Sequence, residues 1–477
     1  MERAKVILQR SRKKRLEQGH PWIYANEIER MEGEAAAGDL VDILAANGRY
    51  LATGYWNPAS QITVRVVSRK PVDALDSVFF AEKFRDCQQH RRRFVEDKDC
   101  RLVYGEADYV PGLIVDRFGE ILVVQILTLG LDVRRDEIVK ALVDVFAPRG
   151  IYERSDVGVR KLEGLEETTG VLYGECPRIV EIVENGLRME VDLVEGQKTG
   201  YFYDQRENRA SIAPLMTGWG SLSGIRLERR AASELPEGAA ALQGRGEAGT
   251  TEAEAAGDSV LVPVNANGKI VTFPYWDGAT VLECFAHTGS FTLHACKYGA
   301  KKVTCLDISE HAIETARRNV ARNGFEGRVE FVVSDAFDYL RAQVKGLEER
   351  SLRAAGGKGA DTSKPLGAAG RTWDVVVLDP PAFAKTKNAV AGACRGYKDI
   401  NLHGMKLVNE GGYLVTASCS YHMKPELFLE TIREAAADAG KLLRLVEWRA
   451  AGKDHPQLLG VPEGNYLKFA VFEVRSM

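Results

Sequence analysis

The chain has 477 residues, of which 45% are apolar and 27% charged. These values are typical of a globular protein with about three domains, and they exclude a disordered, collagen-like or coiled-coil chain. No apolar run reaches the ~18 residues of a membrane-spanning helix, and no apolar segment follows the basic N-terminus, so we expect a cytoplasmic protein without membrane contact.

Charge is distributed unevenly along the sequence. Sixty-four basic and 67 acidic residues give a net charge of −3, which argues neither for nor against a nucleic-acid partner. Residues 1–20, however, hold seven Lys or Arg against two Glu, and a second basic cluster spans residues 90–93. Local positive density favours a surface that meets phosphates, although a solvated helix or strand face explains it equally well.

The eight cysteines are spread over the whole chain and form no CxxC pair. This spacing favours neither a disulfide framework nor a zinc site, so we expect reduced thiols and no bound metal. Seven are expected to be small buried apolar side chains. Cys419 differs because it is predicted to lie at a strand end.

Two smaller domains are predicted in the first 190 residues. Residues 1–72 contain short β-branched runs separated by an Asn47-Gly48 turn, the pattern of a small β-rich module. Residues 73–190 begin with the amphipathic stretch FFAEKFRDCQQHRRRFV and continue with strands such as GLIVDRF, a helical segment and a further strand pair. This succession predicts an α+β middle domain.

From about residue 279, strands alternate with helices. Such alternation predicts an α/β fold, a Rossmann-like doubly wound parallel sheet with helices on both faces. The last two strands, LLRLVEW and YLKFAVFEV, are separated by a loop alone and are expected to form a closing antiparallel hairpin. Two stretches, about 217–258 and 346–371, are rich in Ala, Gly, Glu and Ser and are expected to be flexible surface insertions.

Candidate ligand-binding residues follow the first three strands, because a doubly wound sheet binds its ligand at the carboxyl ends of its strands. The first strand ends in ECFAHTGSF, where the small residues 288–290 let the backbone approach a ligand. Asp307 ends the second strand, where a carboxylate accepts hydrogen bonds from ribose hydroxyls, and Asp335 ends the third, within reach of an adenine amino group. Acids also cap helices at such positions. The turn lacks G-x-G-x-x-G, which favours S-adenosylmethionine over a dinucleotide.

The next two strands end in DPPAF, residues 379–383, and SCS, residues 418–420. Two prolines stiffen the first turn and project its carboxylate, and Phe383 offers a ring face to a base, although prolines also simply end strands. Cys419 is predicted to emerge beside the strand that carries Asp379. A thiolate that adds to carbon 6 of cytosine makes carbon 5 nucleophilic enough to take a methyl group. Asp379 would hydrogen-bond the ring as charge develops.

At these residues the chain resembles the class I S-adenosylmethionine-dependent RNA methyltransferases, and within them the RlmI-type family of large-ribosomal-subunit cytosine-5 methyltransferases. GHPWIYANEI and GYWNPASQITVRVVS are similar to that family's N-terminal PUA RNA-binding domain, and GEADYVPGLIVDRFGE to the start of its middle domain. VEGQKTGYFYDQRENR, LDPPAFAK, RGYKDIN and SCSYHM are similar to motifs of its methyltransferase domain, which would span residues 191–477. The resemblance covers nearly the whole chain apart from the two insertions.

This resemblance implies methyl transfer to carbon 5 of a cytosine in 23S ribosomal RNA, with Cys419 as the nucleophile. It implies that the following residues contact S-adenosylmethionine: Lys198, Asp204, Arg206, Phe285, Thr288, Gly289, Ser290, Asp307, Asp335 and Asp379. Glu283 stands where the family commonly has Asp, a change that keeps the carboxylate. The expected partner is 23S ribosomal RNA or a large-subunit precursor, and we expect a homodimer.

Two other functions stay open. The chain could methylate an exocyclic amine of RNA at the Asp379 turn, with Cys419 as a structural residue. The usual turn for that reaction places the aromatic residue directly after Pro-Pro, whereas here Ala382 intervenes before Phe383. Alternatively, the chain could be a non-catalytic RNA-binding ribosome-assembly factor whose sheet is only a scaffold.

Overall fold

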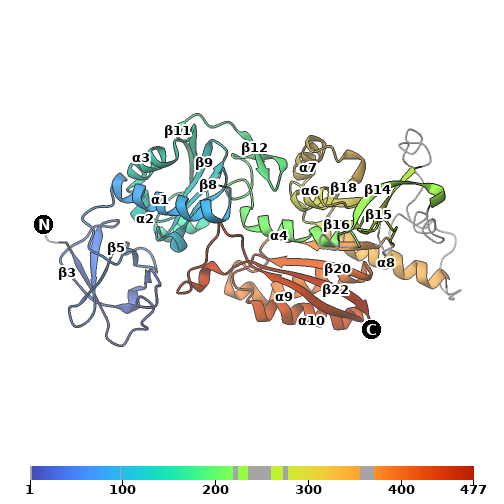
Figure 1. The fold of residues 1–477 in the computed structure, drawn as a ribbon. Coiled ribbons are helices and arrows are strands. Elements are labelled where there is room, and N and C mark those ends of the chain that lie inside the picture. The colour runs from blue at the N-terminus through green and yellow to red at the C-terminus, as the bar shows by residue number, and fades with distance from the viewer. Residues whose placement is uncertain (1–2, 97, 219–223, 235–258, 272–277, 355–369) are drawn as a thin grey trace. The chain divides into compact units, whose positions relative to one another are not determined.

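A computed structural model describes residues 3–96, 98–218, 224–234, 259–271, 278–354 and 370–477 (Figure 1). The chain divides into two compact units. The first comprises Met1–Glu207 and Ala451–Asn465, and the second Asn208–Ala450 and Tyr466–Met477. Among the helices of the described ranges, none combines the length and apolar character that a bilayer crossing requires.

The first unit begins with a six-stranded sheet. Its strands lie in the order β2-β6-β5-β4-β1-β3 and comprise β1 (Lys5–Leu8), β2 (Trp22–Ile23), β3 (Ile28–Glu32), β4 (Leu40–Leu44), β5 (Tyr50–Trp56) and β6 (Val64–Ser68). β1 is parallel to β4, and the other neighbouring pairs are antiparallel. Between β4 and β5, Gly48 adopts a φ of 80°, as a tight Asn-Gly turn requires. Alternate residues of β4, Val41 and Ile43, enter the core.

A five-stranded sheet with packed helices follows. Its order is β11-β10-β9-β8-β7, with β7 (Asp99–Tyr104), β8 (Leu113–Phe118), β9 (Ile121–Ile126), β10 (Gly150–Ser155) and β11 (Thr168–Gly174). The helices are α1 (Ser77–Phe94), α2 (Leu129–Asp132) and α3 (Arg135–Phe146), and β12 (Ile179–Glu184) and β13 (Leu187–Asp192) form a hairpin. Helix α1 begins after Asp76, whose carboxylate accepts a hydrogen bond from the Phe79 amide at 2.9 Å.

The two sheets of the first unit share packed residues. Tyr55 of β5 is buried in the same apolar cluster as Phe80 and Phe84 of α1. Its hydroxyl donates a hydrogen bond of 2.7 Å to the carbonyl oxygen of Pro111. Because these parts form one compact unit, the boundary expected near residue 72 stays a prediction.

The second unit is built on a seven-stranded sheet of order β18-β17-β16-β19-β20-β22-β21. Its strands are β16 (Thr280–Cys284), β17 (Lys302–Asp307), β18 (Val329–Val333), β19 (Trp373–Leu378), β20 (Val408–Ser418), β21 (Lys441–Arg449) and β22 (Lys468–Ser476). The first five are parallel, and β22 is antiparallel to both β20 and β21. The predicted α/β fold with a closing antiparallel hairpin is confirmed.

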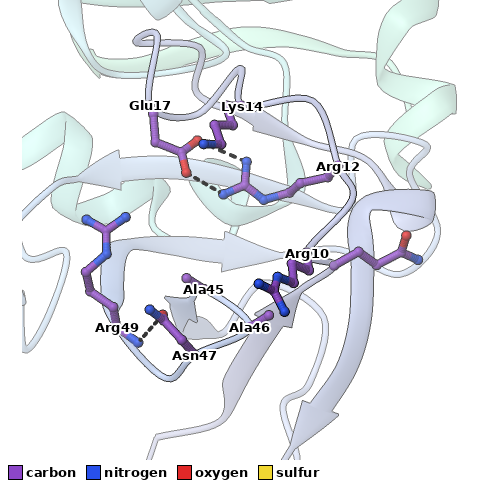
Figure 2. Close-up of a pocket in the computed structure, with 9 residues that line it drawn as sticks. Arg10, Arg12, Lys14, Glu17, Ala45, Ala46, Asn47 and Arg49 are labelled. Atoms are coloured by element: carbon purple, nitrogen blue, oxygen red, sulfur yellow. Dashed lines mark hydrogen bonds and ion pairs between the residues drawn. The ribbon is translucent and has the colours of Figure 1, made fainter.

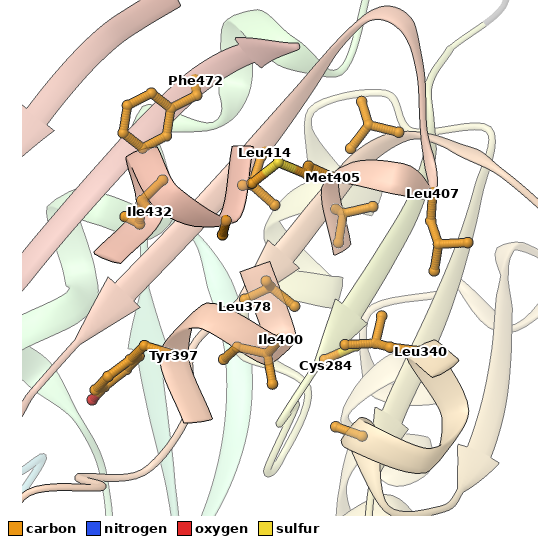
Figure 3. Packing of buried hydrophobic residues seen from close by; sticks show 14 of the residues in the cluster. Cys284, Leu340, Leu378, Tyr397, Ile400, Met405, Leu407, Leu414, Ile432 and Phe472 are labelled. Atoms are coloured by element: carbon orange, nitrogen blue, oxygen red, sulfur yellow. The ribbon is translucent and has the colours of Figure 1, made fainter. Parts of the chain in front are cut away.

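Helices cover both faces of this sheet: α6 (Ser290–Lys297), α7 (Glu310–Arg322), α8 (Ala336–Ala354), α9 (Val390–Lys406) and α10 (Pro425–Ala439), with α4 (Arg206–Ser211) preceding it. Val376 and Leu378 of β19 pack with α8, α9 and α10 in the cluster of Figure 3. Val375 and Val377 pack on the opposite face with Phe291 of α6. Both faces are therefore covered, which explains why residues 375–378 of this strand are all apolar.

The structure differs from the expected insertions in two places. Strand β14 (Arg226–Ala231) lies inside the first stretch and pairs antiparallel with β15 (Ser259–Val264), and α8 continues to Ala354 inside the second. The expectation rested on the shortage of large apolar residues in these stretches. A strand such as β14 can form without them, because its backbone hydrogen bonds to a neighbouring strand do not depend on side chains. Of these stretches, residues 219–223, 235–258 and 355–369 lie outside the described residues.

The segment between β21 and β22 belongs to the first unit rather than the second. Its Asp454 is fully buried, and its carboxylate accepts hydrogen bonds from the Arg101 amide at 3.1 Å and pairs with the His455 ring at 2.8 Å. Its carbonyl oxygen accepts from Arg91, which also binds Asp108 through two contacts of 2.7 Å. Burial alone would raise the pKa of Asp454, but His455 and Arg206 outweigh it and hold the pKa well below its usual range.

We expect Asp454→Asn to destabilise the first unit by about 3–5 kcal/mol at neutral pH, because buried cations would lose their counter-charge. Urea unfolding measures this loss. The wild-type carboxylate contributes its full stability above the unfolded-state pKa of about 4 and loses it as the pH falls toward the lower folded-state pKa, so the two proteins should begin to converge only below about pH 4. Asp144→Asn is the control, because Asp144 is 60% exposed and its partner Arg85 is 56% exposed. A loss no larger than that of the control would contradict this prediction.

Candidate active site

The turn after β16 holds three residues in the left-handed region. Phe285, His287 and Gly289 have φ values of 62°, 49° and 79°. For residues with a side chain this conformation costs about 1–3 kcal/mol each and concentrates at ligand-binding and catalytic positions. A Cβ on Gly289 would lie 3.0 Å from that of Ala316 on α7, so the turn passes against this helix where only glycine fits without a shift.

Asp307 ties the end of β17 to this turn. Its Oδ2 accepts a hydrogen bond of 2.8 Å from the His287 amide, and its Oδ1 accepts one of 2.9 Å from the Ser309 amide. The residue is half-buried. A carboxylate has about four acceptor sites. Ribose hydroxyls can therefore still donate to the carboxylate while it fixes the turn.

The neighbouring predicted residues lie at helix starts on the same edge of the sheet. Asp335 precedes α8, and its carboxylate accepts from the Asp338 amide at 3.1 Å, so the helix-capping role considered for such acids is present. The Thr288 carbonyl accepts from Asn319 at 3.2 Å, and Ser290 begins α6. Asp335, Thr288 and Ser290 are all half-buried.

Phe383, in the turn after β19, packs within a group of aromatic rings. Its ring centroid lies 4.7 Å from that of Tyr397, 5.8 Å from Phe337 and 6.5 Å from Phe285. The ring is half-buried, and these neighbours occupy much of its surface. Instead of standing alone as a stacking platform, it links the turn after β19 to the turn after β16.

Cys419 and the Asp379 turn come together at the carboxyl ends of β19 and β20. The two strands pair in parallel, with Leu378 opposite Thr416. The Cys419 thiol lies 3.9 Å from the carbonyl oxygen of Pro380, the residue after Asp379. Cys419 is partly exposed, a property it shares with two other cysteines, whereas five are buried. The buried ones are Cys87, Cys100, Cys284, Cys296 and Cys305.

The backbone after Cys419 is held by several hydrogen bonds. The Ser420 hydroxyl oxygen lies 3.1 Å from the donating Ala384 amide and 3.0 Å from the Tyr397 hydroxyl. The Ser420 carbonyl accepts a 2.6 Å hydrogen bond from the ammonium of Lys468, which also donates to the Tyr466 carbonyl at 2.6 Å. Sequence reasoning missed Lys468 because it lies in an apolar terminal strand, 49 positions after Cys419.

Glu283 is a buried acid behind the turn after β16. Its Oε2 accepts hydrogen bonds from the Thr292 amide at 2.7 Å and the Thr292 hydroxyl at 2.5 Å. Burial raises the pKa of Glu283 to about 8, and the carboxylate of Asp379 adds to the rise, while the bonds from Thr292 oppose it. Glu283 thus anchors the first turn of α6 to the end of β16, and its charge is coupled to that of Asp379.

The first three predicted cofactor contacts belong to the other compact unit. Arg206 is buried, donates to the Asp99 carbonyl and faces the Glu184 carboxylate at 3.7 Å. Burial alone would lower the pKa of Arg206, but the carboxylates of Asp454 and Glu184 raise it above its ordinary value. The structure therefore gives Arg206 a set of partners inside the first unit.

Lys198 and Asp204 differ in their exposure. The exposed Lys198 has a left-handed φ of 54°, and its ammonium lies 4.6 Å from the centroid of the Phe202 ring. Asp204 is buried, and its carbonyl oxygen accepts from the Gly452 amide at 2.8 Å. For Lys198, Asp204 and Arg206, contact with a cofactor stays a prediction.

The basic N-terminal segment borders a pocket of about 610 Å³ on the first sheet (Figure 2). It presents four cationic side chains and one carboxylate; its lining is Gln9, Arg10, Arg12, Lys14, Glu17, Ala45, Ala46, Asn47 and Arg49. Arg12 binds Glu17 at 2.7 and 3.0 Å, and these hydrogen bonds lower the pKa of Glu17. A concave surface with this excess of positive charge suits an anionic ligand such as a phosphate chain.

Within the described ranges, no cluster of His, Cys, Asp or Glu is arranged to hold a metal ion.

Comparison with known proteins relates both units to described families. Residues 6–69 match the family model of a PUA-like domain, and residues 276–448 match that of a methyltransferase domain. Ribosomal RNA large subunit methyltransferase I of Shewanella denitrificans is 35% identical over 476 residues, covering 98% of this chain and 99% of that protein. The protein of the same name from Escherichia coli O157:H7 is 34% identical over 470 residues, covering 97% and 98%.

Two solved structures share the fold over nearly the whole chain. One, named as a SAM-dependent methyltransferase from Streptococcus mutans, has a TM-score of 0.67 at 19% identity and covers 98% of this chain and 99% of its own. The other, the methyltransferase SMU.776 complexed with SAH, has a TM-score of 0.69 at 20% identity with the same coverage.

Because Glu283 has a raised pKa, the wild-type protein should lose stability as the pH rises from about 4.5 to about 8. In that window the unfolded state releases a proton that the folded state retains. Glu283→Gln removes this dependence and keeps an oxygen to accept from Thr292. We expect the variant to gain about 1.4 kcal/mol on the wild type for each pH unit crossed inside the window.

Urea unfolding at several pH values measures this difference. Glu349→Gln, at an exposed position of α8, is the matched control and should follow the wild type. Parallel pH dependences for the wild type and Glu283→Gln would show that Glu283 is ionised in the folded protein, contrary to this prediction.

Proposed function

Because the chain belongs to the ribosomal RNA large subunit methyltransferase I family, we propose that it methylates carbon 5 of a cytosine in 23S ribosomal RNA, using S-adenosylmethionine. The observation that carries the proposal is the position of Cys419. Its thiol is partly exposed at the carboxyl edge of the sheet, 3.9 Å from the turn that begins with Asp379. A nucleophile and a carboxylate on neighbouring strand ends suit covalent activation of a pyrimidine ring.

The residues at the turn after β16 fit the proposed cofactor. The turn that follows β16 holds three residues in left-handed conformations, which concentrate at ligand-binding positions. Asp307 keeps acceptor capacity for ribose hydroxyls, and Asp335 lies at the next strand end for the adenine amino group. The proposed contacts of Lys198, Asp204 and Arg206 with the cofactor rest on the family resemblance alone. S-adenosylmethionine supplies an electrophilic methyl group when bound.

Cys419 would act on the cytosine ring in its thiolate form, which is the nucleophilic form of cysteine. The sulfur bonds to carbon 6, and the electron pair of the former double bond between carbons 5 and 6 makes carbon 5 nucleophilic. Carbon 5 would then bond to the methyl group, while the methyl–sulfur bond of S-adenosylmethionine breaks and its electron pair stays on sulfur, leaving S-adenosylhomocysteine. A base or a water molecule would take the proton from carbon 5, which re-forms the double bond between carbons 5 and 6. The bond between carbon 6 and sulfur would break in the same step and release the thiolate.

Asp379 would contact the cytosine ring during thiolate addition. Negative charge develops on the ring as the sulfur bonds to carbon 6, so a carboxylic acid that donates a hydrogen bond to a ring nitrogen would stabilise this state. The rigid turn keeps the carboxyl group in place, because Pro380 and Pro381 restrict φ. Coupling to the buried Glu283 links the charge of Asp379 to the packing behind it.

The basic pocket of Figure 2 is the proposed anchor for RNA. Phosphate contacts from Arg and Lys supply affinity that does not depend on sequence and that weakens as salt rises. The target cytosine must leave its stack to reach Cys419, so a single-stranded or extruded nucleotide is expected. A homodimer and a cytoplasmic location stay predictions from the sequence.

Methylation of an exocyclic amine is the alternative reaction at the same edge. It would require the Asp379 turn to accept the amino hydrogens and an aromatic face to hold the base. Phe383 packs against Tyr397 and Phe337, so much of its ring is covered and less of it is available to hold a base. This arrangement favours the cysteine mechanism. The two reactions differ in whether a covalent bond forms between protein and RNA.

We expect RNA that carries 5-fluorocytidine to form a covalent adduct with the protein in the presence of S-adenosylmethionine. Fluorine on carbon 5 blocks the final proton loss, so the bond from Cys419 to carbon 6 should persist. Mass spectrometry of the adduct identifies the attached residue. Cys419→Ala should abolish the adduct, and Cys394→Ala, at another partly exposed cysteine, should retain it. Methyl transfer to ordinary RNA by Cys419→Ala would exclude the cytosine-5 mechanism.

Removing positive charge from the basic pocket should weaken RNA binding similarly for all sequences. For Arg10→Ala combined with Arg49→Ala, the slope of log affinity against log salt should fall by about 1.4–1.8, because two phosphate contacts are lost. Fluorescence anisotropy over a salt series measures the slope. The control Arg30→Ala removes an exposed arginine that is paired with Glu29 and Glu32. An unchanged slope in the double variant would place the RNA elsewhere.

A further inference from the structure

We propose that Lys468 is a positioning residue for Cys419, one that fixes the backbone beside the cysteine and favours its thiolate by charge. This inference rests on the proposed function, because it concerns the nucleophile of that reaction. It begins from the register of the sheet. Lys468 is the first residue of β22 and lies directly opposite Ser418, the last residue of β20.

The burial of Lys468 is the first supporting observation. Only 1% of the residue is exposed, whereas lysine is almost never fully buried unless its charge has a partner. Its neighbours along β22, Phe469 and Val471, are apolar core residues. Burying a lysine at the first position of an apolar strand costs desolvation free energy. An apolar residue at this position would fill the space without that cost.

The hydrogen bonds of Lys468 are the second observation. Its ammonium donates to the carbonyl oxygens of Ser420 and Tyr466, both at 2.6 Å. Together with the contacts of the Ser420 hydroxyl to Ala384 and Tyr397, these bonds hold the residue after Cys419 from three sides. The position of the thiol is thereby set by β22, α9 and the turn after β19. One N–H group of the ammonium serves this purpose, and a second binds the Tyr466 carbonyl within the loop that leads into β22.

The charges around Cys419 are the third observation. Burial lowers the pKa of Lys468 to about 8, and the interaction with Cys419 opposes this shift while Lys424 adds to it. The attraction is mutual, so a protonated Lys468 favours the thiolate of Cys419 by the same free energy. At pH values below about 8 the ammonium form prevails, which covers the neutral range.

Other groups face the thiol from the elements packed around it. Lys424 stands at the start of α10 and adds positive charge, and Tyr397 of α9 interacts electrostatically with Cys419. Asp379, next to the contacting Pro380, opposes thiolate formation when it is ionised. Of the two cations, Lys468 is buried and Lys424 is exposed, so solvent screens the charge of Lys468 less.

The experiment is the pH dependence of Cys419 alkylation by iodoacetamide, followed by mass spectrometry of the peptide that contains Cys419. It needs neither RNA nor methyl transfer. Lys468→Met removes the charge and keeps the length of the side chain, whereas Lys468→Arg keeps the charge. We expect the midpoint of the Lys468→Met profile to rise by about one pH unit, so that alkylation at pH 7 slows about ten-fold.

Lys468→Arg should restore most of the wild-type rate, and Lys441→Met, at a surface lysine bonded to Ser476, should match the wild type. Calorimetric titration with S-adenosylhomocysteine tests whether each variant keeps a folded site. Superimposable profiles for wild type and Lys468→Met would overturn the inference. If Lys468→Met does not fold, Lys468→Arg decides, because this variant keeps the charge. A rise of about one pH unit in its midpoint, the shift expected for loss of the charge, would then also overturn the inference.

The outcome is separate from that of the adduct experiment. An adduct on Cys419 with an unshifted Lys468→Met profile would leave the proposed reaction standing and refute the role of Lys468. A shifted profile without any adduct would establish the coupling of Lys468 to Cys419 and refute the cytosine-5 reaction.

Discussion

Parallel pairing of β16 with β17 on one side and β19 on the other is the constraint on which the candidate site depends. The register places Glu283 of β16 opposite both Cys305 and Val377, so the three strands end at one edge. Each strand must then turn there before its helix crosses back over the sheet. Residues as far apart in sequence as Phe285 and Phe383 thus come together, and the hydrogen bond from the His287 amide to Asp307 joins two of the turns.

Burial of both faces of the sheet determines how polar residues behave behind this edge. A polar group there must find a partner or stay uncharged. Glu283 accepts two hydrogen bonds from Thr292 and has a pKa raised by burial, whereas Lys468 keeps its charge beside two carbonyl oxygens. One buried group therefore limits negative charge near Asp379, and the other supplies positive charge near Cys419. The site combines an acid and a base whose ionisation the core controls.

The first unit uses buried charge for a different purpose. Arg91 pairs with Asp108, and Asp454 lies among Arg101, His455 and Arg206. The strands before and after Asp454 in the chain, β21 and β22, belong to the second unit. Ion pairs of this kind stabilise less than apolar packing but are costly to break. They favour one defined position for the segment 451–465 within the first unit over an unspecific apolar contact. Arg206 takes part in this network and is also one of the residues expected to contact the cofactor.

The α/β fold, the order of strands and helices, and the residues at the strand ends can be predicted from the sequence. The period of the apolar pattern, the strand length and the turn residues are local properties of the sequence. They predict Asp307, Asp379 and Cys419 at one edge of the sheet, because parallel strands share their direction. The roles of Lys468, Glu283 and Asp454 emerge only in the folded chain. Their burial, partners and charge coupling arise from segments distant in sequence, and an apolar strand that begins with lysine looks locally like a strand with a solvated end. Composition likewise missed β14, because backbone pairing with β15 depends on a partner that lies 28 residues further along.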